Sequence, residues 1–222
     1  MKFQAAIFDM DGLLIDSELY WGKAEEAMWP KFGLSRSPSL SQEILGLNLT
    51  DTCIVVQKYR PDLSAEFIKS VLNAAAEGVY RQAELLPGAH KLLTDLKHTG
   101  TKIGLASSSP QAWIDLFLDK YGLQHFFDEV LSTEGLHLPG KPAPDVYREC
   151  MKRLGVVSTA TVIFEDTTVG LASARASGAY TIAVPDQRWS FGDFSSADQI
   201  ASSLADEKVY QVLGLNQSKS ML

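Results

Sequence analysis

Two aspartates, Asp9 and Asp11, stand one residue apart directly after a short apolar run. Alternate side chains of an extended chain point the same way, so the two carboxylates are expected to lie together. Carboxylates at close range repel each other unless a cation or a proton lies between them. Such a pair can hold a metal ion, attack an electrophile or transfer a proton, whereas a pair in a solvated loop does none of these. Both interpretations stay open on this stretch alone.

Three later stretches also carry polar side chains suited to chemistry. They are Ser107 and Ser108 in "ASSSP", Lys141 in "GKPAPDVY", and Glu165 and Asp166 in "FEDTTVG". A hydroxyl beside free amides at the start of a helix binds an anion, and Ser109 followed by Pro110 predicts such a start. Carboxylates supply the hard oxygen ligands that Mg²⁺ prefers. Taken singly, each stretch has an ordinary interpretation: a capped helix, a solvent-exposed lysine at a helix start, and a pair of capping acids.

The elements that must position these side chains are short apolar runs separated by segments with helical spacing. The runs that predict buried strands are residues 5–8, 103–106, 130–131, 162–164 and 182–184. Strands alternating with helices predict an α/β fold, in which a parallel sheet is covered by helices on both faces. Each polar stretch follows a predicted strand or precedes the helix after one. Because ligands bind beyond the carboxyl ends of parallel strands, we expect all four stretches to meet at one edge.

Residues 17–85 interrupt this rhythm, because they contain helical patterns and no convincing strand. We therefore expect an all-helical cap at 17–85, inserted after the first strand into a core formed by residues 1–16 and 86–222. Ser64 is the expected N-cap of the longest cap helix, and Asp16 that of the first. Another cap helix is expected to begin at Thr50 or Asp51, two residues that can act as N-caps.

The bulk composition excludes several classes of function. The 222-residue chain has a formal net charge of −7, which argues against nonspecific nucleic-acid binding. Cys53 and Cys150 form no metal-binding or disulfide pattern, as is typical of reduced thiols in a cytosolic protein. Neither a signal peptide nor a membrane-spanning segment is evident. We expect a cytoplasmic monomer that binds neither membranes nor nucleic acid.

The four stretches "DMDGLLIDSE", "ASSS", "GKPAPDVY" and "FEDTTVG", in this order, resemble the four motifs of the haloacid dehalogenase-like hydrolases. The similarity spans residues 4 to about 185. It is greatest to the sugar-phosphatase and β-phosphoglucomutase branch of that family. The resemblance implies a Rossmann-like core with a helical cap inserted after the first motif, in agreement with the organisation expected from the apolar runs.

The resemblance also implies catalytic roles. Asp9 would be the nucleophile that attacks phosphorus and forms an aspartyl-phosphate, and Asp11 would protonate the leaving alcohol and then activate water. Ser107 and Ser108 would bind the phosphoryl group. Lys141 would neutralise charge on the nucleophile and on that group. Dehalogenases of the family lack the second aspartate, so the presence of Asp11 favours phosphate chemistry.

The cofactor implied by the resemblance is Mg²⁺. Asp9, the carbonyl of Asp11 and Asp166 would bind the ion, and Glu165 would support them. A carboxylate can attack an anionic phosphate only when positive charge offsets their repulsion. This requirement agrees with the acids and the lysine expected at one edge of the sheet.

The expected cap differs from that of the mutase branch, which carries a basic pair for a second phosphate and a histidine after the first motif. The comparable positions here are Leu45 and Leu49, which flank Gly46, and Trp21. We therefore favour a phosphatase that acts on a small phosphorylated metabolite, most simply a sugar or sugar-alcohol phosphate. The alternatives are a β-phosphoglucomutase-type hexose-phosphate mutase and an inactive phosphosugar-binding protein.

Other cap residues have two interpretations each. Trp21 either closes the site over a sugar or makes a hinge contact. Asn48 and Thr50 either donate and accept hydrogen bonds with substrate hydroxyls or cap a helix.

Overall fold

The computed structural model describes residues 2–216, in which six strands form one parallel sheet in the order β3-β2-β1-β4-β5-β6. The strands are β1 (Ala5–Phe8), β2 (Lys102–Ser107), β3 (Glu129–Ser132), β4 (Thr161–Glu165), β5 (Tyr180–Ala183) and β6 (Gln199–Ile200). The parallel α/β fold predicted from the apolar runs is confirmed, with all five predicted strands. The two-residue strand β6 was not predicted, because so short a segment has no hydrophobic period to detect.

Helices surround this sheet and extend beyond it. They are α1 (Ser17–Met28), α2 (Pro38–Ile44), α3 (Leu49–Tyr59), α4 (Ala65–Gln82), α5 (Ala89–His98), α6 (Gln111–Tyr121), α7 (Asp145–Leu154), α8 (Thr168–Ser177) and α9 (Glu207–Leu213). Short 3₁₀ turns, η1 to η3, occupy Trp29–Phe32, Gln124–Phe126 and Ser158–Ala160. No helix within residues 2–216 is both long and apolar enough to cross a bilayer.

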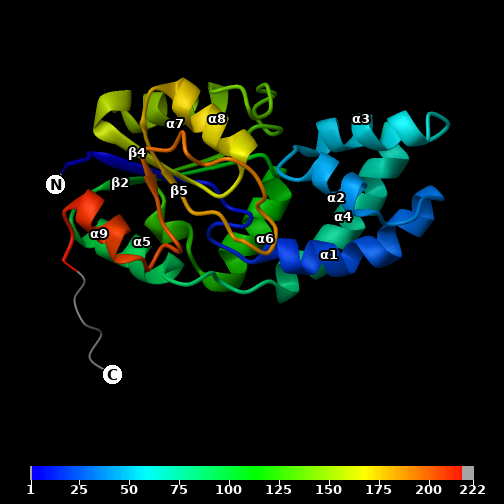
Figure 1. The fold of residues 1–222 in the computed structure, drawn as a ribbon, viewed down its shortest axis with the longest axis horizontal. Coiled ribbons are helices and arrows are strands. Elements are labelled where there is room, and N and C mark those ends of the chain that lie inside the picture. The colour runs from blue at the N-terminus through cyan, green and yellow to red at the C-terminus, as the bar shows by residue number, and fades with distance from the viewer. Residues whose placement is uncertain (1, 217–222) are drawn as a thin grey trace.

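Both faces of the sheet are buried because neighbouring residues of each strand point to opposite sides. Ala6 and Phe8 belong to a cluster shared with α5, α6 and α9, whereas Ala5 and Ile7 pack with α7 and α8. Figure 1 shows these two helical layers on either side of the strands. Phe8 also stacks on Phe164 of the neighbouring strand, with ring centroids 4.6 Å apart. This packing holds in place the strands whose ends carry the site residues.

Helices α1–α4 follow β1 and lie together at one end of the molecule (Figure 1). The chain passes between these helices and the sheet twice, and the two passages are hydrogen bonded to each other. The Asp16 amide donates to the Glu84 carbonyl at 2.8 Å, and the Leu86 amide donates to the Leu14 carbonyl at 3.0 Å. Below, α1–α4 are called the cap. We propose that the domain boundaries lie at these passages, as expected; residues 1 and 217–222 of the expected core lie outside the described part of the chain.

Of the expected N-caps, only Ser64 is confirmed, because its hydroxyl accepts a hydrogen bond from the Phe67 amide at 3.2 Å. The expectation of Thr50 or Asp51 was wrong by two to three residues. Asn48 is the N-cap of α3, and its side chain accepts from the Asp51 amide at 2.8 Å. Of its two interpretations, Asn48 therefore takes the structural one.

The side chains of two other expected N-caps form hydrogen bonds with distant residues instead of with a helix end. Asp16 precedes α1 but makes no capping hydrogen bond; its carboxylate accepts from Arg188 at 3.0 Å. Ser109 was wrong as a cap, because α6 is preceded by Pro110 and the Ser109 hydroxyl donates to Asp11. In both cases a distant partner uses the polar atoms that local spacing assigns to a helix end.

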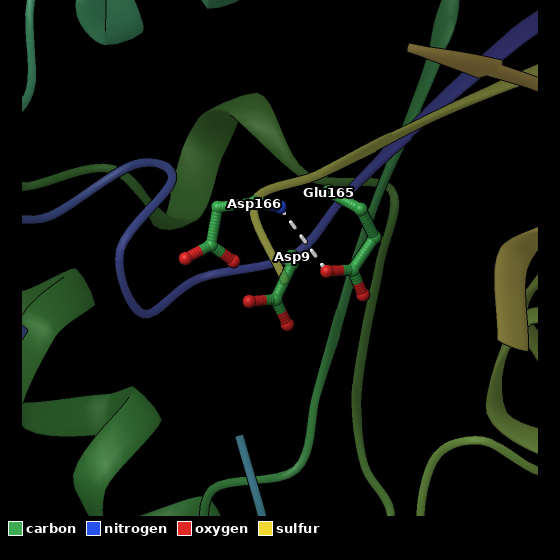
Figure 2. Close-up of side chains that lie close together, drawn as sticks. All are labelled: Asp9, Glu165 and Asp166. Atoms are coloured by element: carbon green, nitrogen blue, oxygen red, sulfur yellow. Dashed lines mark hydrogen bonds between the residues drawn. The ribbon is translucent and has the colours of Figure 1, made fainter. Parts of the chain in front are cut away.

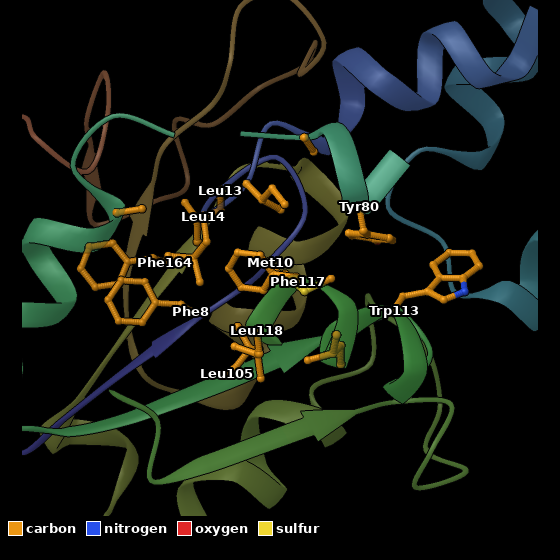
Figure 3. Close-up of a cluster of buried hydrophobic side chains, with 14 of the residues drawn as sticks. Phe8, Met10, Leu13, Leu14, Tyr80, Leu105, Trp113, Phe117, Leu118 and Phe164 are labelled. Carbon is orange, nitrogen blue, oxygen red and sulfur yellow. The ribbon is translucent and has the colours of Figure 1, made fainter. Parts of the chain in front are cut away.

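A continuous apolar cluster joins the sheet to the cap. Figure 3 shows it running from Phe8 and Phe164 through Met10 and Phe117 toward Tyr80. In the same cluster, Trp113 of α6 also reaches the cap, since its indole nitrogen donates to Asn73 of α4 at 2.9 Å. The end of α4 is thus packed directly over the residues that follow β1.

Candidate active site

The site lies where β1, β2 and β4 end at the same edge of the sheet. Asp9 is the first residue after β1, and its amide donates to the Phe164 carbonyl of β4 at 3.1 Å. Ser107 ends β2, Glu165 ends β4, and Asp166 follows it. Parallel pairing in register places these ends side by side. The structure therefore brings the predicted site residues together.

Lys141 lies in the loop between β3 and α7 and reaches into this edge. Its ammonium group donates to Asp9 Oδ1 at 2.6 Å and to Glu165 Oε1 at 2.7 Å, while Tyr147 also donates to Glu165 Oε1. Only 6% of Lys141 is exposed. Burial alone would lower the pKa of this ammonium, but Asp9 and Glu165 raise it above its usual range, so the lysine stays charged.

The expectation that Lys141 stands at a helix start was wrong, because α7 begins at Asp145. An unfavourable interaction between the lysine and the positive end of that helix dipole therefore does not arise. The two carboxylates hold the lysine instead.

Three buried carboxylates form a cluster suited to a divalent cation. One oxygen from each of Asp9, Glu165 and Asp166 lies within 4.8 Å of the other two. Figure 2 shows these three side chains close together. Asp166 Oδ1 is buried without a hydrogen-bond partner among the described residues. Burial, with Asp9 and Glu165 adding to it, raises the pKa of Asp166 well above its usual range. Burial likewise raises the pKa of Asp9, to about 7, even though Lys141 opposes the shift. An orphaned buried oxygen and carboxylates that resist ionisation are the features that a bound cation would satisfy.

The chain passes close to this cluster at Gly12, whose φ is +73°. A Cβ atom at this position would overlap the Asp166 carboxylate. A glycine is required here for both its backbone conformation and its lack of a side chain. The turn after Asp11 can therefore approach Asp166 as closely as it does.

Asp11 is held apart from the three-carboxylate cluster by two hydroxyl groups. Tyr80 donates to its Oδ1 and Ser109 to its Oδ2, both at 2.7 Å. Tyr80 belongs to α4 of the cap, whereas Ser109 follows β2 in the core. Tyr80 was not predicted as a site residue, because its partner Asp11 is 69 positions away along the chain. The two aspartates therefore have different surroundings: Asp9 contacts a cation, and Asp11 accepts from neutral donors.

The two predicted phosphate-binding serines also differ from each other. Ser107 Oγ accepts from the Ser109 amide at 3.0 Å, which shapes the turn after β2. Ser108 Oγ is buried with no partner among residues 2–216. Ser107, Ser108 and Lys141 nevertheless line one cavity together with Asp9 and Asp11. The polar side chains predicted at the strand ends thus surround a single space.

This cavity, about 110 Å³ in volume, lies between the cap and the core. Its core wall also includes Ser109, Trp113 and Thr167. Its cap wall is formed by Glu18, Trp21, Glu25, Met28, Ser41, Ile44, Leu45, Gly46, Leu47, Leu49, Thr52 and Leu72. Trp21 faces Trp113, with ring centroids 5.3 Å apart. Among the described lining residues, Lys141 is the only basic one.

A family model described as haloacid dehalogenase-like hydrolase matches residues 6–184, which is most of the chain. The chain belongs to the haloacid dehalogenase-like hydrolases. This confirms the resemblance that the four motifs indicated. The hydrolase is 34% identical over 216 residues to hexitol phosphatase B of Escherichia coli strain K12, covering 95% of this chain and 96% of that protein.

Two further comparisons agree. The hydrolase is 31% identical to a probable pseudouridine-5'-phosphatase of Drosophila melanogaster, over 95% of this chain and 94% of that one. Its fold is similar to that of β-phosphoglucomutase from Clostridium difficile, with a TM-score of 0.82, 20% identity, and coverage of 95% of this chain and 96% of the other. The structural similarity establishes the fold alone.

Proposed function

We propose that this hydrolase is a Mg²⁺-dependent phosphatase that removes the phosphate from a small sugar or sugar-alcohol phosphate through an aspartyl-phosphate. The observation that carries the proposal is the different environment of the two aspartates. Asp9 is paired with the buried cation of Lys141, and Asp11 is held by two hydroxyls beside the same cavity. The names of the curated relatives, hexitol phosphatase B and a probable pseudouridine-5'-phosphatase, support the same chemistry.

In the first step Asp9 attacks phosphorus. Lys141 binds Asp9 Oδ1, whereas Oδ2 accepts no hydrogen bond from residues 2–216 and is free to form the new bond. As that oxygen–phosphorus bond forms, the bond between phosphorus and the substrate oxygen breaks. Asp11, protonated at this stage, gives its proton to the leaving oxygen and releases the alcohol.

In the second step water hydrolyses the aspartyl-phosphate. Asp11 takes a proton from the water as it attacks phosphorus, and the bond to Asp9 breaks. Inorganic phosphate leaves, Asp9 is restored as a carboxylate, and Asp11 regains the proton needed for the next cycle. Lys141 offsets the negative charge on Asp9 throughout, while Ser107 and Ser108 donate to the phosphoryl oxygens.

The residues proposed to hold Mg²⁺ are Asp9, Asp166 and the carbonyl of Asp11. Glu165 supports them mainly through Lys141, because its Oε1 accepts hydrogen bonds from both Lys141 and Tyr147. When bound, the cation would neutralise charge on the phosphoryl group and so let a carboxylate approach it. The Asp11 carboxylate is outside the three-carboxylate cluster, in agreement with its proposed role in proton transfer.

The direct test of the proposal is phosphate release from a panel of phosphomonoesters. We expect turnover of hexitol phosphates, hexose phosphates and p-nitrophenyl phosphate with Mg²⁺, and none after exhaustive treatment with EDTA. Restoration by added Mg²⁺ would support the proposed cofactor. Equal rates with EDTA and with Mg²⁺ would overturn it.

Metal binding should be strongly pH-dependent. The pKa values of Asp9 and Asp166 are raised in the folded, metal-free protein. Between their unfolded pKa values near 4 and their folded values, the folded state holds more protons, so its stability falls as pH rises. Mg²⁺ replaces those protons. At pH 8, Mg²⁺ at a hundredfold excess over its Kd should raise the free energy of unfolding by about 2.7 kcal/mol and the Tm by about 5–10 °C. The same concentration of Mg²⁺ should have a much smaller effect at pH 5.5.

Thermal unfolding with EDTA or excess Mg²⁺ at the two pH values measures this difference. Asp166→Asn should abolish the Mg²⁺-dependent shift, and Asp193→Asn, on an exposed loop, should keep it. An equal shift at both pH values, or a full shift in Asp166→Asn, would contradict the assignment.

Tyr80→Phe tests whether the cap positions Asp11. The variant keeps the ring but removes the hydroxyl that donates to Asp11 Oδ1. We expect kcat to fall about tenfold or more with little change in KM, because a hydrogen bond to a charged group is worth about 1.5–3 kcal/mol. Steady-state kinetics and the pH profile of kcat measure the effect. Tyr59→Phe, which removes an exposed hydroxyl bonded to Glu43, is the control and should behave as wild type; a wild-type profile for Tyr80→Phe would refute the role.

The alternatives find less support in the cavity. A hexose-phosphate mutase must hold a second phosphate, yet Trp21, Leu45 and Leu49 line the cap wall where that branch has its histidine and basic pair. An inactive binding protein would not need Asp11 beside Asp9. The expectations of a monomer, a cytoplasmic location, and no membrane or nucleic-acid partner stay predictions; gel filtration would test the first.

A further inference from the structure

Helix α1 contributes four side chains to the cavity lining, and two of them are acidic. Glu18, Trp21 and Glu25 are spaced by three and four residues, so they share one face of the helix, and all three line the cavity. The negative charge of Glu25 is compensated locally, because its Oε2 accepts from Arg36 at 2.9 Å and from Ser41 at 2.6 Å. Glu18 has no comparable partner.

The Glu18 carboxyl makes neither a hydrogen bond nor an ion pair with any residue in 2–216. A partly buried carboxyl without a donor is unfavourable unless a ligand supplies one. Burial, followed by the charges of Asp11 and Glu25, raises the pKa of Glu18 to about 8. The Glu18 carboxyl can therefore hold a proton at neutral pH, and can both donate and accept a hydrogen bond. A hydroxyl group can both accept a hydrogen bond from this carboxyl and donate one to it. An anion would instead be repelled by the acidic side chains nearby, and by Glu18 itself when it is ionised.

A second polar group without a partner among the described residues lies on the core wall of the cavity. Ser108 is 9% exposed, its hydroxyl has no partner among the described residues, and it lines the same cavity near Asp9. One ligand that spans the cavity would satisfy both groups, with its phosphoryl end at Ser108 and a hydroxyl at Glu18. Such a ligand carries its hydroxyl groups on the side away from phosphorus.

The rest of the cavity restricts the charge of that ligand. Lys141 is the only basic residue among the described lining residues, and it is already paired with Asp9 and Glu165. A second phosphate or a carboxylate on the substrate would find no unpaired basic side chain among the described lining residues. The faces of Trp21 and Trp113 instead offer apolar contact to the carbon chain of a polyol.

We infer that Glu18 is a specificity-determining residue that hydrogen bonds a hydroxyl of the leaving group and restricts the enzyme to monophosphates of uncharged polyhydroxy alcohols. The inference rests on the proposed phosphatase function and names the substrate class of the same site. It assigns to α1 the selection that the mutase branch achieves with basic cap residues.

The test compares three esters: sorbitol 6-phosphate, 2-phosphoglycolate as a substrate with a second anion, and p-nitrophenyl phosphate. Wild type should hydrolyse sorbitol 6-phosphate with a kcat/KM at least about a hundredfold above that for 2-phosphoglycolate, near the upper end of what one hydrogen bond to a charged group supplies. Glu18→Leu should raise KM for sorbitol 6-phosphate about tenfold or more, with little change in kcat. The ratio of kcat/KM for sorbitol 6-phosphate to that for p-nitrophenyl phosphate, which offers Glu18 no hydroxyl group, should therefore fall about tenfold.

Two further variants sharpen the result. Glu18→Gln keeps the capacity to donate and to accept a hydrogen bond but cannot ionise. It should keep sorbitol 6-phosphate turnover within a few-fold and should raise activity toward 2-phosphoglycolate only above about pH 8, where the wild-type carboxyl is ionised. Glu26→Leu alters an exposed acid of the same helix that does not line the cavity, and should leave all three reactions unchanged.

The outcomes separate the inference from the function on which it rests. An unchanged KM for sorbitol 6-phosphate in Glu18→Leu, or equal wild-type efficiency on the two metabolite esters, would overturn the role of Glu18. An equal loss of kcat/KM for p-nitrophenyl phosphate in Glu18→Leu would also overturn it, since the preference for the hydroxylated ester would then be unchanged. If wild type released phosphate from none of the three esters, the phosphatase proposal itself would fall.

Discussion

Asp9→Asn should reduce phosphate release from every ester by about 10⁴-fold or more, as is typical when a covalent nucleophile is removed. The amide keeps the shape of the side chain but cannot form a bond to phosphorus. Folding should be maintained, because Lys141 still pairs with Glu165 at 2.7 Å. Steady-state phosphate release with Mg²⁺ measures the loss, and thermal unfolding verifies that the variant is folded.

A labelling experiment distinguishes covalent catalysis from a merely electrostatic role of Asp9. Acid quenching after incubation with ³²P-labelled substrate should trap label on the wild-type protein and none on Asp9→Asn. Asp193→Asn removes an exposed carboxylate of the 185–195 loop and should retain both activity and labelling. Undiminished label in Asp9→Asn, or activity within tenfold of wild type, would contradict an aspartyl-phosphate at this residue.

Lys141→Met should destabilise the metal-free protein by about 3–5 kcal/mol, the cost of leaving buried charges without their partner. The methionine fills similar volume but leaves Asp9 and Glu165 facing each other, and Glu165 is only 1% exposed. Without the lysine, Asp9, whose pKa burial already raises to about 7, would bind a proton in the folded state over a wider range above its unfolded pKa. Because such groups lose stability as pH rises, the deficit should grow from pH 5 to pH 8. Urea unfolding in EDTA at both pH values measures it.

The matched control is Lys152→Met, whose side chain is 78% exposed and pairs with Glu149 on the surface of α7. It should change stability by less than about 0.5 kcal/mol. Glu165→Gln combined with Lys141→Met should recover part of the lost stability, because the Asp9 carboxylate then no longer faces a second buried carboxylate. A loss below about 1 kcal/mol for Lys141→Met alone would indicate that the buried pair contributes little.

The parts of the site carried on strand ends were predictable from the sequence. Asp9, Ser107 and Asp166 each end or follow a strand, and parallel strands place their carboxyl ends at one edge wherever the connecting helices run. Lys141 was also predicted in the site, but partly from an assumed position at the start of a helix. Helix α7 in fact begins four residues later, at Asp145. Its position depends on the charges of Asp9 and Glu165, which only the folded structure brings together.

The contacts between cap and core were not predictable in the same way. Tyr80 ends a regular amphipathic helix, and nothing in its neighbours distinguishes it from an ordinary core residue. Its partner Asp11 is defined by the docking of α4 over the first loop. Ser109 and Asp16 illustrate the converse, because their local spacing indicates helix caps while distant residues take their polar atoms. Local patterns cannot reveal which of two partners a polar side chain will bind.

The hydrogen bonds between residues 14–16 and 84–86 give the inserted helices a single narrow stem. The chain leaves the sheet and returns to it at adjacent points, so the strand ends experience the insertion almost as they would a short loop. The length of an insertion adds only slowly to the entropy of closing it. We therefore expect that helices of another size could replace α1–α4 without displacing Asp9, Lys141 or Asp166, provided that a donor in place of Tyr80 still reached Asp11.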